Sequence, residues 1–181
     1  MNADYIILLA LENEAPGLIG KPGVFFTGVG KVNAAIVAAT LIERYNPKRV
    51  FNFGTAGGIG LEHGKIYKCT HFSQRDVILG GCIVGPQAEV LHAPVVLNND
   101  DGVRLSTGDN FVTDTYNISA DMVDMEAFSI AKACEVAGVE FICYKYISDM
   151  ADENAADHFV DSVHKGEEHY IEILQRYGIE L

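Results

Sequence analysis

Runs of apolar residues with the length of strands alternate along this chain with segments whose apolar residues recur at helical spacing. The first run, residues 5–11, is apolar on both faces, which is typical of a central strand covered on two sides. Further strands are predicted at 24–27, 49–53, 65–72, 120–125 and 140–147, with shorter β-like runs at 77–84, 90–97 and 103–107.

Three segments carry a helical pattern. The first begins after the Gly28–Lys31 turn, at Val32, and continues to about residue 45; its predicted buried face is Val32, Ala35, Ile36, Ala39 and Ile42. The second opens at Glu126 and stops at Gly138, and the last covers 162–177, after a weakly helical region that follows Asp152. Its predicted inward residues are Val163, Tyr170, Ile173 and Leu174. Strands that alternate with helices predict one α/β domain over residues 1–181, with a mostly parallel or mixed central sheet.

Carboxylates follow three of the predicted strands. Glu12 and Glu14 come after the first, Glu126 stands where residues 120–125 give way to a helix, and Ser148 and Asp149 end the strand at 140–147. Active sites in α/β sheets collect outside such strand ends. Each residue also has an ordinary explanation: a solvated turn for the first two, a helix-dipole contact for Glu126, and a helix N-cap for Ser148 or Asp149.

Two glycine-rich segments are candidates for ligand contact. The turn at 28–31 could bind an anion through the N–H groups of the next helix, with charge from Lys31, although a tight turn without a ligand explains it equally well. Residues 54–60 hold four glycines, so a planar or sugar-like ligand could approach the backbone closely.

Composition narrows the classes of partner. The chain has a formal net charge of −12, with 49% hydrophobic residues. Without a basic stripe, nucleic acid and anionic membranes are poor partners, and we expect a small or weakly charged substrate. The four cysteines show no C-x-x-C spacing, and we find no signal peptide. We therefore expect free thiols in the cytoplasm, and neither a metal nor a cofactor.

The segment Asp124–Ala127 resembles the Met-Glu-Ala signature of the nucleoside phosphorylase and nucleosidase superfamily. Five further segments match that family in the same order: 10–15, 27–31, 52–58, 106–111 and 147–152. The hydrolytic branch that the chain resembles is that of the 5'-methylthioadenosine/S-adenosylhomocysteine nucleosidases. The resemblance implies a three-layer fold, a purine nucleoside substrate and a homo-oligomer, with a dimer favoured. The chain is shorter than typical members between residues 77 and 107.

The resemblance also implies roles for the carboxylates. Asp149 would protonate purine N7, Glu14 would activate the attacking water, and Glu126 would bind the ribose hydroxyls while Met125 packs under the sugar. Asp149 must hold a proton near neutral pH, which we expect from partial burial or from a donor such as Ser148 that raises its basicity.

The remaining candidates are binding residues. By resemblance, Thr55, Ala56 and Gly57 line the base and ribose pocket, Phe111 stacks on the purine, and the backbone of Val112 meets its edge. Without the resemblance, Phe111 is equally explained as a core residue.

Phosphorolysis is the alternative to hydrolysis. It needs cationic clamps for phosphate, usually arginine, and where phosphorolytic relatives place them this chain has Glu14 and Asn52. We therefore favour a hydrolase, although Arg75, Lys31 or an arginine of a neighbouring subunit could still serve a phosphorylase. A non-catalytic nucleoside-binding module is the third alternative, and the sequence gives no role for Arg75 and Asp76.

Overall fold

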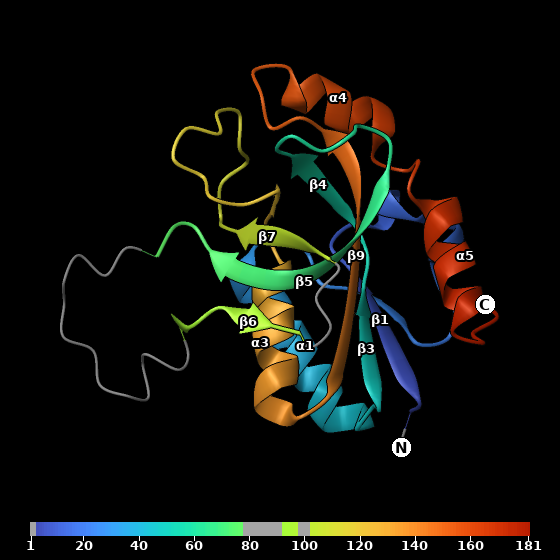
Figure 1. Cartoon of the computed structure of the whole chain (residues 1–181). Coiled ribbons are helices and arrows are strands. Elements are labelled where there is room, and N and C mark those ends of the chain that lie inside the picture. Colours follow the sequence, from blue (N-terminus) through green and yellow to red (C-terminus); the bar gives the residue numbers. More distant parts are fainter. Residues whose placement is uncertain (1–2, 78–91, 98–101) are drawn as a thin grey trace.

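The computed structural model describes residues 3–77, 92–97 and 102–181, and nine strands of this part form one mixed sheet (Figure 1). The strands are β1 (Tyr5–Leu9), β2 (Val24–Phe26), β3 (Arg49–Asn52), β4 (Thr55–Gly58), β5 (Ile66–Gln74), β6 (Val95–Val96), β7 (Val103–Thr107), β8 (Met122–Asp124) and β9 (Glu140–Asp149). Their order is β2-β1-β3-β9-β4-β8-β7-β5-β6. Strand β5 also pairs antiparallel with β9, so the sheet curls back on itself.

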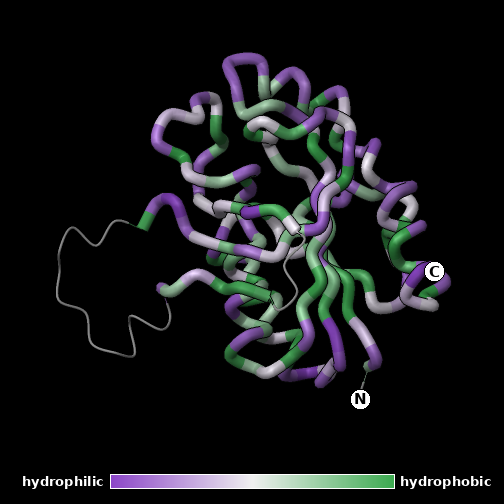
Figure 2. Tube along the Cα trace, viewed as in Figure 1, coloured by the Kyte–Doolittle hydropathy of each residue, from purple (hydrophilic) through white to green (hydrophobic). Residues whose placement is uncertain are grey.

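Helices cover both faces of the sheet, which confirms the three-layer prediction. The helices are α1 (Lys31–Tyr45), α3 (Ala127–Ala137), α4 (Ala155–Ser162) and α5 (Glu167–Arg176). Helices α1 and α3 pack on one face of the sheet and share one hydrophobic cluster. Helix α5 packs on the other face over a second cluster (Figure 1). Figure 2 shows hydrophobic positions concentrated along the central strands between these layers. Helix α4 lies beyond the end of β9, where it can cover a site at the strand ends.

The predicted final helix over 162–177 is confirmed with a later start, at Glu167, and the weakly helical region predicted after Asp152 contains α4. The chain forms two helices, α4 and α5, separated by a turn at 163–166. Gly166 lies against Tyr170, with room for no side chain: a Cβ there would come within 2.3 Å of the Tyr170 hydroxyl. The residues predicted to point inward, Val163, Tyr170, Ile173 and Leu174, are all buried.

The predicted buried face of α1 is also wrong, apart from Ile42. The residues that pack on the sheet are Ala34, Ala38, Leu41 and Ile42. Val32 and Ile36 are instead 67% and 60% exposed. Both stripes of this helix are apolar in sequence, so periodicity alone could not choose between them.

Residues 55–58, expected to be part of a glycine-rich loop, form strand β4. This strand pairs with β9 and with β8. Gly57 allows the close approach, because a Cβ there would lie 2.8 Å from Asp149 Oδ1 and 3.2 Å from Val123 Cγ2. The glycines therefore bring the ends of three strands together.

The other predicted strands are confirmed with shifted ends. Strand β8 is shorter than the predicted 120–125, and β5 continues to Gln74. The β-like run at 103–107 is β7, that at 90–97 is represented by β6, and residues 78–84 lie outside the described part. Among the described residues, no helix has both the length and the apolar character needed to cross a membrane.

Candidate active site

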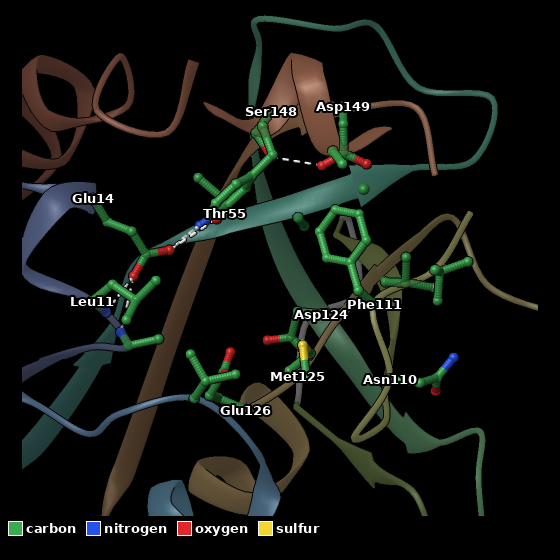
Figure 3. Close-up of a pocket in the computed structure, with 18 of the residues that line it drawn as sticks. Leu11, Glu14, Thr55, Asn110, Phe111, Asp124, Met125, Glu126, Ser148 and Asp149 are labelled. Carbon is green, nitrogen blue, oxygen red and sulfur yellow. Dashed lines mark hydrogen bonds between the residues drawn. The ribbon is translucent and has the colours of Figure 1, made fainter. Parts of the chain in front are cut away.

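A pocket of about 350 Å³ opens at the ends of β1, β4, β8 and β9, a volume that suits a small molecule (Figure 3). All ten residues singled out from the sequence line it. They are Glu14, Thr55, Ala56, Gly57, Phe111, Val112, Met125, Glu126, Ser148 and Asp149. The pocket therefore brings together carboxylates from three segments of the chain. The outermost two, Glu14 and Asp149, are more than 100 positions apart in the sequence.

Glu14 lies buried on a short 3-10 helix after β1, and four donors bind its carboxylate (Figure 3). Oε2 accepts from the backbone N–H groups of Ala10 and Leu11, at 3.0 and 2.9 Å. Oε1 accepts from the Thr55 N–H at 2.8 Å and from the Thr55 hydroxyl at 2.9 Å. Three of these donors are fixed in the backbone, whereas the Thr55 hydroxyl can rotate. A water could therefore reach Glu14 by replacing the Thr55 hydroxyl. Glu12, two residues earlier, is exposed, as expected.

Glu126 does not serve as the hydrogen-bonding cap of α3, although it is the N-cap residue. Asp124 Oδ2 accepts the Ala127 N–H at 2.9 Å, and the Thr107 hydroxyl accepts the Phe128 N–H at 3.0 Å. The Glu126 carboxylate instead accepts the Gly30 N–H at 2.8 Å at the pocket. Burial, together with the nearby charge of Asp124, raises the pKa of Glu126 to about 7.

The glycine-rich turn before α1 holds the protein's own carboxylates. The Gly30 N–H binds Glu126, and the Lys31 N–H binds Asp109 Oδ1 at 2.7 Å. The suggestion that this turn accommodates an external anion is therefore wrong, because two internal acceptors already use these N–H groups.

Asp149 is 3% exposed and ends β9. Burial raises the pKa of its carboxyl, while the Ala151 N–H at 2.9 Å and the Ser148 hydroxyl at 2.8 Å lower it (Figure 3). The expectation that Ser148 raises the basicity of Asp149 thus has the wrong sign, since a donor stabilises the charged form. Burial is the feature that favours a proton on Asp149.

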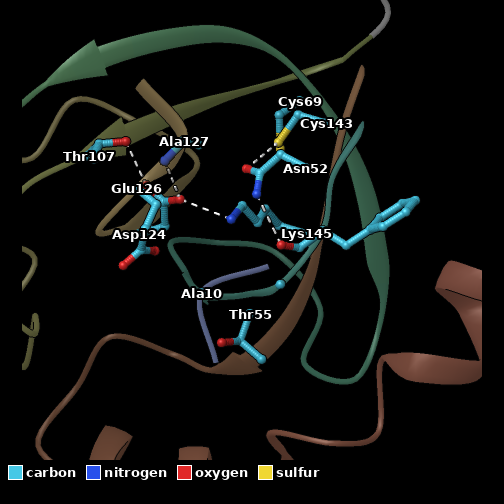
Figure 4. A network of polar contacts seen from close by, with 12 residues as sticks. Ala10, Asn52, Thr55, Cys69, Thr107, Asp124, Glu126, Ala127, Cys143 and Lys145 are labelled. Atoms are coloured by element: carbon cyan, nitrogen blue, oxygen red, sulfur yellow. Dashed lines mark hydrogen bonds and ion pairs between the residues drawn. The ribbon is translucent and has the colours of Figure 1, made fainter. Parts of the chain in front are cut away.

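A buried ion pair that the sequence did not reveal lies behind the pocket (Figure 4). Lys145 Nζ is 3.0 Å from Asp124 Oδ2, with both side chains at most 2% exposed. Burial alone would lower the pKa of Lys145, but the carboxylates of Asp124, Glu126 and Glu14 raise it above its usual value. This ammonium group offsets part of the negative charge that the pocket concentrates.

Arg75, which lines the pocket, and Lys31 are the two cations considered for a phosphate clamp, and both bind groups of the protein itself. The Arg75 guanidinium donates to four backbone carbonyl oxygens. The Lys31 ammonium binds Asp76 and Gln74. The Arg75 Nη groups and the Lys31 Nζ group that a phosphate clamp would use already bind protein acceptors.

The mouth of the pocket is apolar. Phe111 contacts Phe159 of α4 edge to face, with ring centroids 6.0 Å apart. Ala156 and Val160 of the same helix also line the cavity. Phe111 is 45% exposed and is not a core residue. The sequence pattern did not reveal the α4 contribution, since that segment was predicted to be only weakly helical.

Comparisons with known proteins agree on one family. The sequence profile of the phosphorylase superfamily matches residues 17–96 and 100–178. A 5'-methylthioadenosine/S-adenosylhomocysteine nucleosidase of Exiguobacterium sp. is 33% identical over 157 residues, which cover 71% of this chain and 67% of that protein. The nucleosidase of the same name from Bacillus cytotoxicus is 29% identical over 166 residues, covering 75% and 72%.

Solved structures share the fold. A futalosine hydrolase mutant of Helicobacter pylori superposes with a TM-score of 0.75 at 19% identity, over 96% of this chain and 97% of that one. The Helicobacter pylori 5'-methylthioadenosine/S-adenosylhomocysteine nucleosidase, in complex with a pyrrolidinol that carries an aminopyrrolopyrimidine, gives a TM-score of 0.74 at 20% identity, over 97% of this chain and 100% of that one.

Proposed function

Because this chain belongs to the phosphorylase superfamily, we propose that it hydrolyses the N-glycosidic bond of a purine nucleoside with an adenine-type base. The observation that carries this proposal is the convergence of Glu14, Glu126 and Asp149 in one pocket. Cleavage of this bond passes through an oxocarbenium-like transition state, which needs an acid for the leaving base and a base for water. The similarity to proteins named as nucleosidases supports the adenine-type base.

In the proposed mechanism each carboxylate has one task. Asp149 donates a proton to purine N7, and its burial favours the protonated form that this requires. Glu14 accepts a proton from the water that attacks the anomeric carbon. Glu126, as a carboxylate, accepts hydrogen bonds from the ribose hydroxyls, and Met125 packs against the sugar. Thr55, which already donates to Glu14, would exchange that hydrogen bond for one with the water.

Water is favoured over phosphate because the donors that could bind an oxyanion are occupied. The Ala10, Leu11 and Thr55 donors bind the Glu14 carboxylate, and a second anion would meet its charge. The guanidinium of Arg75 is likewise engaged by carbonyl groups. The occupied donors around Glu14 and the occupied guanidinium of Arg75 both support a hydrolase.

The direct test is the release of free base from a panel of purine nucleosides, with and without phosphate. We expect release of adenine from adenine nucleosides at equal rates in both conditions. Release that depends on phosphate would indicate the phosphorylase, and binding without release would indicate a nucleoside-binding module. Either result would contradict the proposal.

We further infer that the chain forms a homo-oligomer, with a dimer favoured. Val32 and Ile36 of α1 and Val136 of α3 are exposed beside an apolar groove between these two helices. We expect Ile36→Glu to reduce the particle mass measured by light scattering to that of one chain. Ile19→Glu, at an equally apolar exposed position on another part of the surface, should leave the mass unchanged. A wild-type protein that is already a monomer at micromolar concentration would contradict the inference.

We also infer one domain over residues 1–181 and a location in the reducing cytoplasm. The single sheet takes strands from both halves of the chain, which supports the first inference. Cys69, Cys134 and Cys143 are buried free thiols, which supports the second.

A further inference from the structure

Arg75 has a set of contacts that the proposed mechanism does not use. Its Nη1 donates to the carbonyl oxygens of Ser106 and Asp124 at 2.6 and 2.8 Å. Its Nη2 donates to those of Gly108 and Asn110 at 3.2 and 2.6 Å. The first two acceptors belong to strands β7 and β8, and the other two belong to the loop that follows β7. One side chain therefore connects this loop to the sheet.

The fit around this guanidinium is tight. A Cβ on Gly108 would lie 2.8 Å from Arg75 Cζ and 2.9 Å from Nε. Arg75 Nε is the one buried side-chain nitrogen or oxygen without a hydrogen-bond partner in the described part of the chain. Native structures rarely leave such a group unpaired. Four hydrogen bonds to carbonyl oxygens fix the plane of the Arg75 guanidinium, and in this orientation Nε has no acceptor.

Asp76 secures the same loop from the next position. Its Oδ2 accepts the Asp109 N–H at 2.7 Å, and its Oδ1 binds the Lys31 ammonium. Asp109 in turn accepts the Lys31 N–H at the start of α1. The side chains of Arg75 and Asp76 thus hold the backbone of three consecutive loop residues, 108–110.

The residue that follows the held segment is Phe111, which forms the aromatic wall of the pocket (Figure 3). Phe111 is 45% exposed, and its ring has an edge contact with Phe159, so packing alone restrains the ring weakly. The position of the ring depends on the backbone that Arg75 binds one residue earlier. We propose that Arg75 is a positioning residue for base recognition, which holds Phe111 at the distance from β8 that accommodates a planar base.

This inference rests on the proposed function for its kinetic readout. When a pocket wall binds substrate and transition state equally well, a mutation that weakens this wall raises KM and leaves kcat nearly constant. We expect Arg75→Met to raise KM for the nucleoside about tenfold, which corresponds to about 1.4 kcal/mol, while kcat changes much less. Arg104→Met is the matched control, because Arg104 forms an exposed ion pair with Asp121 away from the pocket; its KM should not change.

A double-mutant cycle with Phe111 separates positioning from general structural support. If Arg75 acts through Phe111, then Arg75→Met has little further effect on KM in a Phe111→Ala background. Gly108→Ala, which displaces the guanidinium and keeps its charge, should reproduce the KM increase. Arg75→Lys can carry the same cycle if Arg75→Met does not fold, as judged by thermal unfolding. Additive effects on KM in the cycle would overturn the proposal.

A ligand-free measurement distinguishes failure of this inference from failure of the proposed function. Amide hydrogen exchange at Phe111 and Val112 should become faster in Arg75→Met, while exchange in β1 stays unchanged. This result is expected even if no nucleoside is cleaved. Unchanged exchange at both residues would refute the positioning role whatever the activity of the enzyme.

Discussion

Asp149→Asn is expected to lower the turnover of an adenine nucleoside by about 10²- to 10⁴-fold, the usual contribution of a general acid. The amide keeps the size of the side chain and can still accept one of the hydrogen bonds from Ser148 and Ala151, so folding and nucleoside binding should be retained. The quantities to measure are kcat from base release and the dissociation constant of a non-hydrolysed nucleoside analogue.

The pH dependence gives a second readout of the same residue. Burial raises the pKa of Asp149, so the protonated form persists to higher pH than for an exposed aspartic acid. Wild-type turnover should fall as pH rises through that pKa, and the residual activity of Asp149→Asn should lack this decrease. Asp161→Asn, at an exposed position on α4, is the control. Unchanged turnover in Asp149→Asn would remove Asp149 from the mechanism.

Glu14→Ala is expected to lower turnover by a similar factor, about 10²- to 10⁴-fold, because it removes the proposed base. It also leaves three backbone N–H groups and the Thr55 hydroxyl without their acceptor. Formate is small enough to take the place of the lost carboxylate and can accept the same hydrogen bonds. We therefore expect added formate to restore part of the activity, with saturation.

Glu12→Ala is the matched control for this experiment, since Glu12 lies two residues away and is exposed. Its turnover should equal that of the wild type, and formate should have no effect on it. Full activity in Glu14→Ala without formate would show that another group activates the water.

The carboxylates could be predicted because they depend on a simple rule of α/β folds. Each follows a strongly apolar run, and the ends of such strands meet on one side of a sheet. That rule predicted a site near Glu12 or Glu14, Glu126 and Asp149, the family resemblance selected Glu14 over Glu12, and the pocket contains Glu14, Glu126 and Asp149. The family resemblance also gave binding roles to Thr55, which pattern alone placed in a glycine-rich candidate loop, and to Phe111, which pattern alone explained equally well as a core residue.

The parts that could not be predicted depend on contacts between distant segments. Lys145 occurs within the mostly apolar middle of its strand, and only the register of β9 brings it to Asp124. Arg75 binds main-chain carbonyl groups, which no side-chain pattern reports. The exposed stripe of α1 has the same apolar character as its buried stripe, so composition could not separate them.

Two glycines, Gly57 in the pocket wall and Gly54 next to Thr55 of that wall, restrict how this enzyme could be redesigned. A side chain at Gly54 would lie 2.9 Å from Glu14 Oε1, and one at Gly57 would lie 2.8 Å from Asp149 Oδ1. A variant library that diversifies this wall to admit new bases would displace Glu14 and Asp149, the two carboxylates that the proposed mechanism uses as base and acid. Substitutions meant to change selectivity for the base are therefore better placed at Phe159 and Val160. These residues of α4 line the same cavity, and no described hydrogen bond joins them to either carboxylate.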